Sequence, residues 1–598
     1  MCAPGQHVPA LVTLLLLSGG AYGQDTGEPD SQEVDEIVVT GSRIPRNTYT
    51  SIAPLQIIAA EDQREIGQID AATVLQESIA ATGLQTERSQ WVGWILPGGP
   101  GSANVSLRGL GAARTLVLIN GRRIGPAGVE GAPSEVDLNV VPSSLVGQYD
   151  LLLDGASSIY GSDAVAGVAN LILRRDFDGF EAEVYATVPE QSGGNETSIN
   201  IAWGKNFRQG FIGIGAEYQD NEAVTYGQRR WTRGCTRNVE VDQLGRIRHD
   251  GHLRSLTYGT PVTECQLDRF GGNIWLDDFR SYTGGIDEGP GAIYYTPGRS
   301  NTGIPGWSET HTFMGGVDGD GDGELDANVF DYSLDHRIDR ASLYSEFDRQ
   351  TTMAYGEYTL AGELALTPFF EAQFARRRHR SDAGTYPFWV PVPPQNPYNP
   401  CNPDGIDGID CIVARNEFWS QPGIIDQFTD WFGVPPSAFG LDANQPVGGI
   451  WVAPRPSIRG DRNIQTAEVS QLRGVVGVRG DLPMLKSEHR DDWQFEVALV
   501  ISDSTGSSSR AGIRYDWLEE SLATSMVDPD SGDVVCGADT SGDGFPDGFL
   551  GNGRPCVPVN LFAPSLYSPV YGDFASQAER DFLFDTRDFE TDYRQWLG

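Results

Sequence analysis

The chain has 598 residues, more than one ordinary domain holds, which predicts at least two structural units. It carries 43 Lys and Arg against 82 Asp and Glu, a formal net charge of −39. A chain this acidic repels nucleic acid, so that class of partner is excluded. Aromatic residues make up 10 % and there are 73 glycines, a mixture that favours many β-strands joined by long polar turns over a disordered chain.

Residues 1–23 are predicted to be a secretory signal peptide. The apolar run Ala10–Leu17 is followed by small residues, and Ala21 and Gly23 suit cleavage after Gly23. The segment before the run contains His7 but no Lys or Arg, which departs from the usual basic start. The run is too short to cross a bilayer as a helix, and no other apolar stretch of spanning length is evident. A membrane form of this protein would therefore cross with β-strands.

The cysteines support export. Cys2 belongs to the signal peptide, and the other six fall into three near pairs. An even number of cysteines in an exported chain predicts disulfides, each closing a local loop. Free or metal-bound thiols are the alternative, although no C-x-x-C spacing is present. The predicted pairs are Cys235–Cys265, Cys401–Cys411 and Cys536–Cys556.

Residues 24–48 are predicted to be a polar tail that carries one extended segment. The segment Asp35–Ser42 has acidic residues first, then a β-prone run, then Gly-Ser. An extended segment at the end of a flexible tail can add as a strand to the sheet edge of another protein. An ordinary first strand of the next domain is the alternative.

Residues 49–177 alternate between helix and strand signals and are predicted to form a small mixed α/β domain. Asp70 can cap a helix whose apolar face includes Leu75 and Ile79. The dipeptide Asn120-Gly121 lies between two β-prone runs, which is a strong signal for a β-hairpin.

Beyond this domain, apolar and polar residues alternate strictly, which predicts β-strands. In one run Phe370, Ala372 and Phe374 alternate with Glu371 and Gln373. A soluble β-sandwich can alternate in the same way. However, the runs are close to the ten or so residues that a strand needs to cross lipid, which favours a transmembrane β-barrel.

The connections between the predicted strands also alternate in length. They are short around Lys205–Gly210 and Leu364–Pro368 and long near 220–350 and 380–462. Short turns on one side and long loops on the other are typical of outer-membrane barrels. All six remaining cysteines lie in the long connections, which fits loops that face an oxidising exterior. Residues 178–598 are therefore predicted to be antiparallel transmembrane barrel strands with long extracellular loops.

Five motifs, in this order, resemble those of the TonB-dependent outer-membrane receptors. Asp35–Ser42 resembles the TonB box, Val105–Gly111 the Arg-Gly segment of the plug domain, and Arg114–Arg123 the hairpin that follows. Asp137–Pro142 and Asp154–Asn170 resemble the last third of the plug. The resemblance implies a mixed α/β plug domain and an antiparallel barrel in the outer membrane of a Gram-negative bacterium.

The resemblance also implies functional residues and partners. The TonB box would be Asp35, Glu36, Ile37, Val38, Val39 and Thr40. The plug motif residues would be Arg108, Gly109, Asn120, Gly121, Asp154, Gly155, Tyr160, Gly161, Asp163 and Asn170. The implied partner is TonB with its inner-membrane energising complex. The implied function is energised uptake of a scarce ligand such as a siderophore or a saccharide.

Two features depart from the family. At Val146–Asp150 the family has an acidic and then an Arg-bearing strand, and this chain lacks both Glu and Arg there, so a local plug contact is expected to be lost. The family's barrel has 22 strands, whereas about seven are recognisable here, with the start of another at Phe589–Leu597. Because an open sheet cannot sit in lipid with bare edges, we expect an incomplete barrel and a fragment of a longer protein. The run Cys556–Phe562 resembles a large-loop branch of the family.

Two acidic loops are candidate structural calcium sites, and no other cofactor is expected. Oxygen-bearing side chains at alternate positions can wrap a hard cation, and a glycine permits the sharp turn. Neither loop has a Glu at the twelfth position, so a solvated acidic loop is the alternative. The candidate ligands are Asp318, Asp320, Asp322, Glu324 and Asp326 in one loop, and Asp539, Ser541, Asp543 and Asp547 in the other.

Other polar clusters give weaker signals. His249 and His252 could hold a transition metal, with polar loop histidines as the simpler interpretation. Arg376–Arg380 lies where a strand would leave the membrane and could bind lipopolysaccharide phosphates, with a generic interfacial charge cluster as the alternative. No G-x-S-x-G, H-E-x-x-H or Walker A motif is present, so no enzyme activity is predicted. The competing functions are a surface-binding or adhesion protein without transport and a soluble secreted β-sandwich enzyme.

Overall fold

The computed structural model describes an N-terminal α/β domain, a large sheet and the connections above that sheet. The described residues are 54–81, 98–129, 135–175, 177–229, 340–383, 385–387, 390–408, 433–439, 451–459, 463–485, 493–567, 573–574 and 576–598, with short strands between 239 and 327 and a few positions within 422–429. The predicted signal peptide and the tail with Asp35–Thr40 lie outside the described residues.

The α/β domain is built on a five-stranded sheet in the order β1-β4-β5-β2-β3. Only β2 and β5 pair in parallel; the other neighbours are antiparallel. The elements are β1 Leu55–Ala59, α1 Ala60–Glu65, α2 Ala71–Gln76, β2 Thr115–Ile119, β3 Arg122–Arg123, β4 Val146–Leu152, α3 Ser157–Tyr160 and β5 Gly167–Leu173, with 3₁₀ turns η1 Ala112–Arg114, η2 Leu138–Val140, η3 Ser143–Leu145 and η4 Ser162–Ala164.

Local sequence explains two of these elements. The carboxylate of Asp70 accepts a hydrogen bond from the backbone N–H of Thr73 at 2.7 Å, so Asp70 caps α2 as predicted. The helix ends at Gln76, however, and Ile79 is 97 % exposed, so the prediction that it shares the buried face of this helix is wrong. Asn120 and Gly121 both have positive φ, 47° and 76°, which forms the tight turn of the predicted β2–β3 hairpin.

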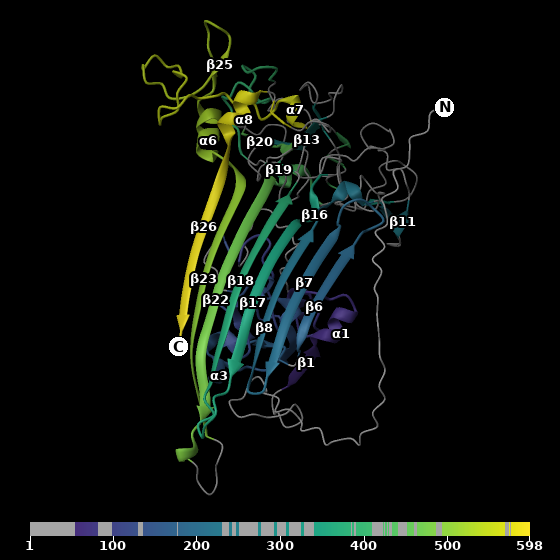
Figure 1. The fold of residues 1–598 in the computed structure, drawn as a ribbon. Helices are drawn as coiled ribbons and strands as arrows, with labels where there is room; N and C mark the ends of the chain where they lie inside the picture. Colours follow the sequence, from purple (N-terminus) through teal and green to yellow (C-terminus); the bar gives the residue numbers. More distant parts are fainter. Residues whose placement is uncertain are drawn as a thin grey trace, which may run out of the picture.

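The large sheet has eight antiparallel strands in the order β26-β23-β22-β18-β17-β8-β7-β6. It forms a curved wall from β6, in blue, to β26, in yellow, with the α/β domain behind its lower half (Figure 1). Within the described part of the chain the wall does not close, and β6 and β26 are its edges. The strands are β6 Gly179–Thr187, β7 Glu196–Phe207, β8 Gly210–Asn221, β17 Glu346–Tyr358, β18 Thr367–Asp382, β22 Ile464–Asp481, β23 Gln494–Ile513 and β26 Phe584–Leu597.

The two faces of this wall have opposite chemistry. On β18, Phe374 is 45 % exposed on the outer face, whereas Gln373 is 2 % exposed on the inner face. A soluble sandwich buries its apolar face, so that alternative does not fit. Apolar residues outside and polar residues inside are the arrangement of membrane-spanning strands. Exposed outer-face residues include Phe180, Val184, Ile199, Ile201, Trp203, Ile214, Phe370, Leu472, Val476, Val497 and Leu499.

Connections at the lower end of the wall are short, whereas those from β8 to β17, β18 to β22 and β23 to β26 at the upper end are long (Figure 1). Two of the long ones, between β18 and β22 and between β23 and β26, fold together around a second hydrophobic core. Asn396 of the first connection donates to the carbonyl of Leu522 in the second at 2.8 Å. Among the described helices, none is long and apolar enough to cross a bilayer.

The upper region contains α6 Tyr515–Thr524, α7 Pro564–Tyr567 and α8 Gln577–Leu583. The predicted Cys536–Cys556 disulfide is present, with the two Cα atoms 5.7 Å apart. Cys401 is disulfide-bonded, whereas Cys235, Cys265 and Cys411 lie outside the described residues. The short strands are β9 Val224–Thr225, β10 Val239–Val241, β11 Ile247–His249, β12 Asn273–Leu276, β13 Ala292–Tyr295, β14 Trp307–Glu309, β15 Leu325–Ala327, β16 Ser342–Tyr344, β19 Thr385–Pro387, β20 Val452–Arg455, β21 Ser457–Arg459, β24 Met526–Val527 and β25 Val534–Val535.

Candidate functional site at the interface between the α/β domain and the sheet

A buried ion pair joins the α/β domain to the middle of the wall. Arg377 on β18 pairs with Asp137, and the side chains are 1 % and 0 % exposed. Arg377 also donates to the carbonyl of Pro100 at 2.8 Å. Asp137 caps the N-terminus of η2 and accepts a hydrogen bond from the backbone N–H of Ala103 at 3.1 Å. One wall residue thereby holds two separate loops of the domain.

A second buried ion pair lies within the wall, and its carboxylate also binds the α/β domain. Arg349 on β17 pairs with Glu217 on β8, and each side chain is 1 % exposed. The other oxygen of Glu217 accepts from the backbone N–H of Ser143 at 3.0 Å. Because a buried charge is stable only when it is paired and fully hydrogen-bonded, Glu217 depends on both contacts.

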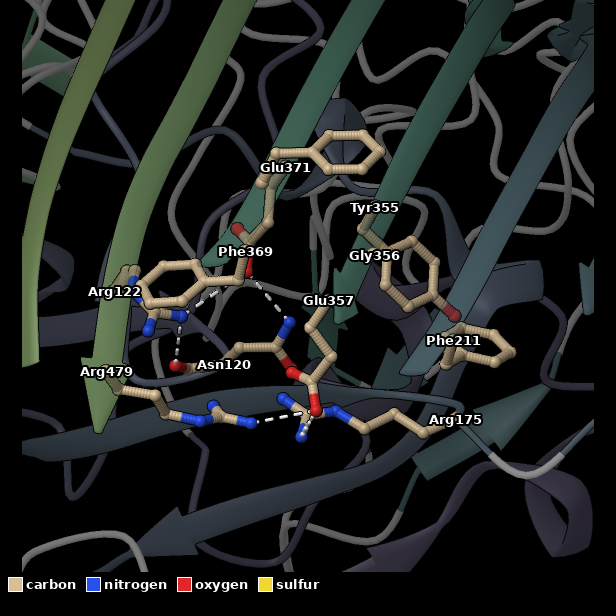
Figure 2. Close-up of a pocket in the computed structure, with 11 residues that line it drawn as sticks. Asn120, Arg122, Arg175, Phe211, Tyr355, Gly356, Glu357, Phe369, Glu371 and Arg479 are labelled. Atoms are coloured by element: carbon tan, nitrogen blue, oxygen red, sulfur yellow. Dashed lines mark hydrogen bonds and ion pairs between the residues drawn. The ribbon is translucent and has the colours of Figure 1, made fainter. Parts of the chain in front are cut away.

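The tip of the β2–β3 hairpin meets a third carboxylate. Glu371 on β18 accepts from Nδ2 of Asn120 at 2.9 Å (Figure 2). It also accepts from Arg473 on β22 at 2.7 Å. Arg122 of the hairpin lies 3.6 Å from Glu371 and pairs with Glu496 on β23 at 2.6 Å. The hairpin is therefore held by three neighbouring strands.

A small cavity of about 20 Å³ lies beside this hairpin tip. In it, Glu357 lies between Arg175 at 3.4 Å and Arg479 at 2.8 Å, and Arg122 stacks 4.2 Å from the ring centroid of Phe369 (Figure 2). That volume holds about one water molecule, so the cavity is part of the interface rather than a ligand site. Its lining residues are Asn120, Arg122, Arg175, Phe211, Tyr355, Gly356, Glu357, Phe369, Phe370, Glu371 and Arg479.

The backbone of the plug loop at 125–128 approaches the backbone of β23 closely. Ser504 donates to the carbonyl of Pro126 at 3.0 Å, and the backbone N–H of Gly125 donates to Ser502 at 3.3 Å. A Cβ on Gly506 would lie 2.2 Å from the carbonyl oxygen of Gly128. This contact therefore requires glycine on the wall.

Several predicted motif residues hold the α/β domain together from within. Arg108, at φ 55°, donates to the carbonyls of Ala166 at 3.0 Å and Val165 at 3.1 Å, and Gly109 follows at φ 70°. The side-chain oxygen of Asn170 accepts from the backbone N–H of Gly121 at 2.9 Å. These residues set the domain's internal geometry, whereas Asn120 also hydrogen-bonds the wall.

The remaining motif residues lie around the turn after β4. Arg123 donates to the carbonyl of Tyr160 at 2.6 Å and pairs with Asp163, and this hydrogen bond from Arg123 holds the pKa of the Asp163 carboxyl below its ordinary value. Gly161 has φ 90°. Asp154 is exposed and accepts from the backbone N–H of Gly155 at 2.7 Å.

Strand β4 forms although Val146–Asp150 lacks the family's acidic and arginine residues. Arg64 of α1 donates to the carbonyl of Val146 at 3.4 Å, and Gln148 donates to Asp150 at 2.9 Å. β4 lies between β1 and β5, so backbone pairing on both sides holds it in place.

Motif matching missed the inward-facing charges of the wall, namely Glu217, Arg349, Glu371, Arg377 and Arg473, and the function of Asp137. The signal was available, because a charged residue at an inward position of an alternating strand needs a buried partner. The sequence does not show which residue is the partner, since Asp137 and Arg377 are 240 positions apart.

Most of the residues predicted to bind metal in the first acidic loop and the histidine pair lie outside the described residues. Of the first acidic loop, Asp318, Asp320, Asp322 and Glu324 lie outside the described residues, and Asp326 is placed only by its backbone in β15. His252 is likewise outside, and His249 ends β11.

The second acidic loop is described, and its carboxylates bind the loop itself. Asp539 accepts from the backbone N–H groups of Gly542 at 2.6 Å and Gly544 at 2.9 Å. Hydrogen bonds from the hydroxyl and backbone N–H of Thr540 hold the pKa of Asp547 below its ordinary value. Among the described residues no group of three or more His, Cys, Asp or Glu is placed to hold a metal ion. Calcium binding stays a prediction.

Comparison with known proteins gives the class. Residues 48–168 match the family model of the TonB-dependent Receptor Plug Domain. Similar solved structures include a variant of the ferric enterobactin receptor PfeA from Pseudomonas aeruginosa with enterobactin, at 12 % identity over 76 % of this chain and 55 % of that one, with a TM-score of 0.27. Another is the siderophore receptor PirA from Acinetobacter baumannii, at 10 % identity over 76 % and 61 %, with a TM-score of 0.24. This chain spans a little over half the length of these receptors.

The α/β domain is thus a TonB-dependent receptor plug domain, seated on the polar inner face of an antiparallel wall whose outer face is apolar. The family match covers the plug domain, residues 48–168, and the wall that holds this domain has an apolar outer face, as membrane-spanning strands have.

Proposed function

We propose that this protein takes part in the energised uptake of a scarce ligand, with the plug as the gate. The observation that carries the proposal is the set of buried polar contacts between plug and wall, above all the Arg377–Asp137 pair, which lies beside an apolar cluster that both parts share. A gate must leave its seat and return. When the plug separates from the wall, water can replace the ion pairs and hydrogen bonds between them. Opening therefore costs less than it would at a wholly apolar interface.

The tail is proposed to deliver the force. Pro54 is the first described residue after the tail, and its carbonyl accepts from the backbone N–H of Leu153 at 2.9 Å. β1 follows at once and, among the described strands, is at the edge of the plug sheet and pairs with β4. If TonB binds Glu36–Thr40 by strand addition, tension on the tail reaches β1 first.

The experiment is Val38→Pro in the whole receptor. Proline removes a backbone donor and is poorly tolerated in a strand that must pair on an edge, so TonB pairing should fail. Cells are given a panel of ⁵⁵Fe-loaded siderophores and radiolabelled saccharides, with and without a protonophore. We expect uptake to be lost while binding at the cell surface is kept.

Ser31→Pro, in the same tail but outside the predicted TonB box, is the matched control and should leave uptake unchanged. Unchanged uptake in Val38→Pro would remove the TonB-box assignment. Surface binding in the wild type that no protonophore affects, with no accumulation, would favour the surface-binding or adhesion alternative instead. The panel also decides the ligand class, which the structure leaves open among siderophores, saccharides and similar molecules.

A further inference from the structure

The outer face of β18 changes from apolar to cationic partway along the strand. Below the change, Phe370 and Phe374 are exposed aromatic residues. Above it, Arg376, Arg378 and Arg380 occupy successive outer-face positions. The side chains of Arg378 and Arg380 are each 50 % exposed. Three guanidinium groups thus form a column on the wall's outer surface.

The position of this column matches the outer boundary of the membrane. A membrane-spanning strand uses about nine to eleven residues, and Arg376 is the tenth residue of β18 counted from Thr367. Gln350 on β17 pairs in register with both Arg376 and Tyr218, so an exposed tyrosine lies in the same row. Tyrosine is enriched at the level of lipid headgroups. Arg378 and Arg380 therefore lie at and just beyond that level.

The column keeps N–H groups available. Glu468 on β22 bridges the lower two arginines, accepting from Arg376 at 2.9 Å and from Arg378 at 3.2 Å. Arg380 lies 3.9 Å from Glu346, beyond hydrogen-bonding distance, and donates no hydrogen bond to another described residue. A guanidinium has five donors, so Arg378 and Arg380 retain most of theirs.

Nearby carboxylates restrict the direction from which an anion can approach. Asp348 lies in register with Arg378 on the β17 side, and Asp220 lies in register with Asp348 beyond it. An anion is repelled from that side. The upper end of the column, around Arg380, is the side on which an anion gains donors without displacing an existing hydrogen bond.

We propose that Arg376, Arg378 and Arg380 form a binding site for a phosphate group of lipopolysaccharide in the surrounding outer leaflet. Arg378 and Arg380 contact the phosphate through their forked N–H groups, a geometry that matches phosphate oxygens. Arg376 anchors Glu468, which keeps the guanidinium of Arg378 in place. The acyl chains then lie along the apolar outer face below, beside Phe370 and Phe374. This site is separate from the plug interface and does not depend on the transported ligand.

The test uses the full chain extracted from outer membranes in mild detergent. Rough lipopolysaccharide is titrated in, and bound molecules are counted by native mass spectrometry. We expect Arg378→Gln with Arg380→Gln to weaken binding about thirtyfold, since two cations are lost at an anionic surface. Arg378→Lys with Arg380→Lys keeps the charges but not the forks, and should weaken binding by a smaller factor, about threefold to fivefold. If the glutamine variant does not fold, the lysine variant tests the proposal, and unchanged binding by that variant would contradict it.

Lys205→Gln is the matched control, because Lys205 is an exposed outer-face cation at the opposite end of the wall. It should leave binding unchanged. Lipopolysaccharide stripped of its phosphates should bind the wild type as weakly as the intact molecule binds the glutamine variant. Full binding by that variant would overturn the proposal. So would equal loss in Lys205→Gln, or equally tight binding of phosphatidylglycerol, because either would show general charge attraction.

Discussion

The Arg377–Asp137 pair offers the sharpest test of how the plug is held. Arg377→Met removes the guanidinium but keeps the length of the side chain, and it leaves the Asp137 carboxylate, which is 0 % exposed, without its counter-charge. Breaking a buried pair from one side costs roughly 3–5 kcal/mol. The carbonyl of Pro100 loses its donor in the same substitution. We therefore expect the seat of the plug around Pro100 and Asp137 to open far more often.

Hydrogen–deuterium exchange of the whole protein in outer-membrane vesicles measures this opening. A loss of 3 kcal/mol corresponds to exchange about a hundredfold faster, since about 1.4 kcal/mol is a factor of ten. The expected change is confined to peptides covering 98–104 and 135–143. Lys205→Met is the matched control, because Lys205 pairs with Asp178 at the lower end of the wall, where both side chains are 47 % exposed and such a pair is worth about 1 kcal/mol or less.

A double-mutant cycle with Asp137→Asn completes the test. The two side chains share one contact, so the double variant should lose much less than the sum of the two single losses. Additive losses, or exchange in Arg377→Met that rises less than tenfold, would refute the view that this pair holds the plug.

Two further predictions concern regions away from this pair. Cys536→Ser opens a loop of 20 residues, so the upper region should lose about 3 kcal/mol of stability. Hydrogen exchange should then be faster over 515–583 and unchanged in plug peptides. An equal change in the plug would contradict an independent upper core. The Asp163 carboxyl has a lowered pKa because of Arg123, so its contribution is present above the ordinary value of 3.8 and is lost as the pH falls below it. Exchange around 160–163 should therefore rise only in that acidic range, and Asp163→Asn should remove this pH dependence; an unchanged pH profile would show that another group titrates.

Local signals in the sequence predicted much of the fold. The Asn120-Gly121 turn needs positive φ at both residues, and both have it. The alternation around Phe370–Phe374 predicted long strands, and only the choice of which face meets lipid needed the structure. The prediction for Ile79 failed because helical spacing continues past Gln76, where the backbone leaves the helix.

Long-range partners could not be predicted in the same way. Asp137 falls within a recognisable motif, and Arg377 falls within a basic run that suggested lipopolysaccharide binding or a generic interfacial charge cluster, whereas Arg377 itself faces inward and is buried. Nothing local pairs them, because the contact depends on how the plug is seated against β18. The upper core was missed for a similar reason: its apolar residues, such as Val392 and Leu522, come from irregular connections without helical or strand periodicity.

That upper core has a consequence for the order in which the protein is assembled. Its buried residues come from two connections, and the second runs to Phe584 at the start of β26. The first connection, which contains Val392, cannot bury its apolar side chains until the chain has been exported at least that far. Until the second connection is present, the apolar side chains of the first connection stay exposed. Folding of the upper region therefore requires both connections, and neither forms this core alone.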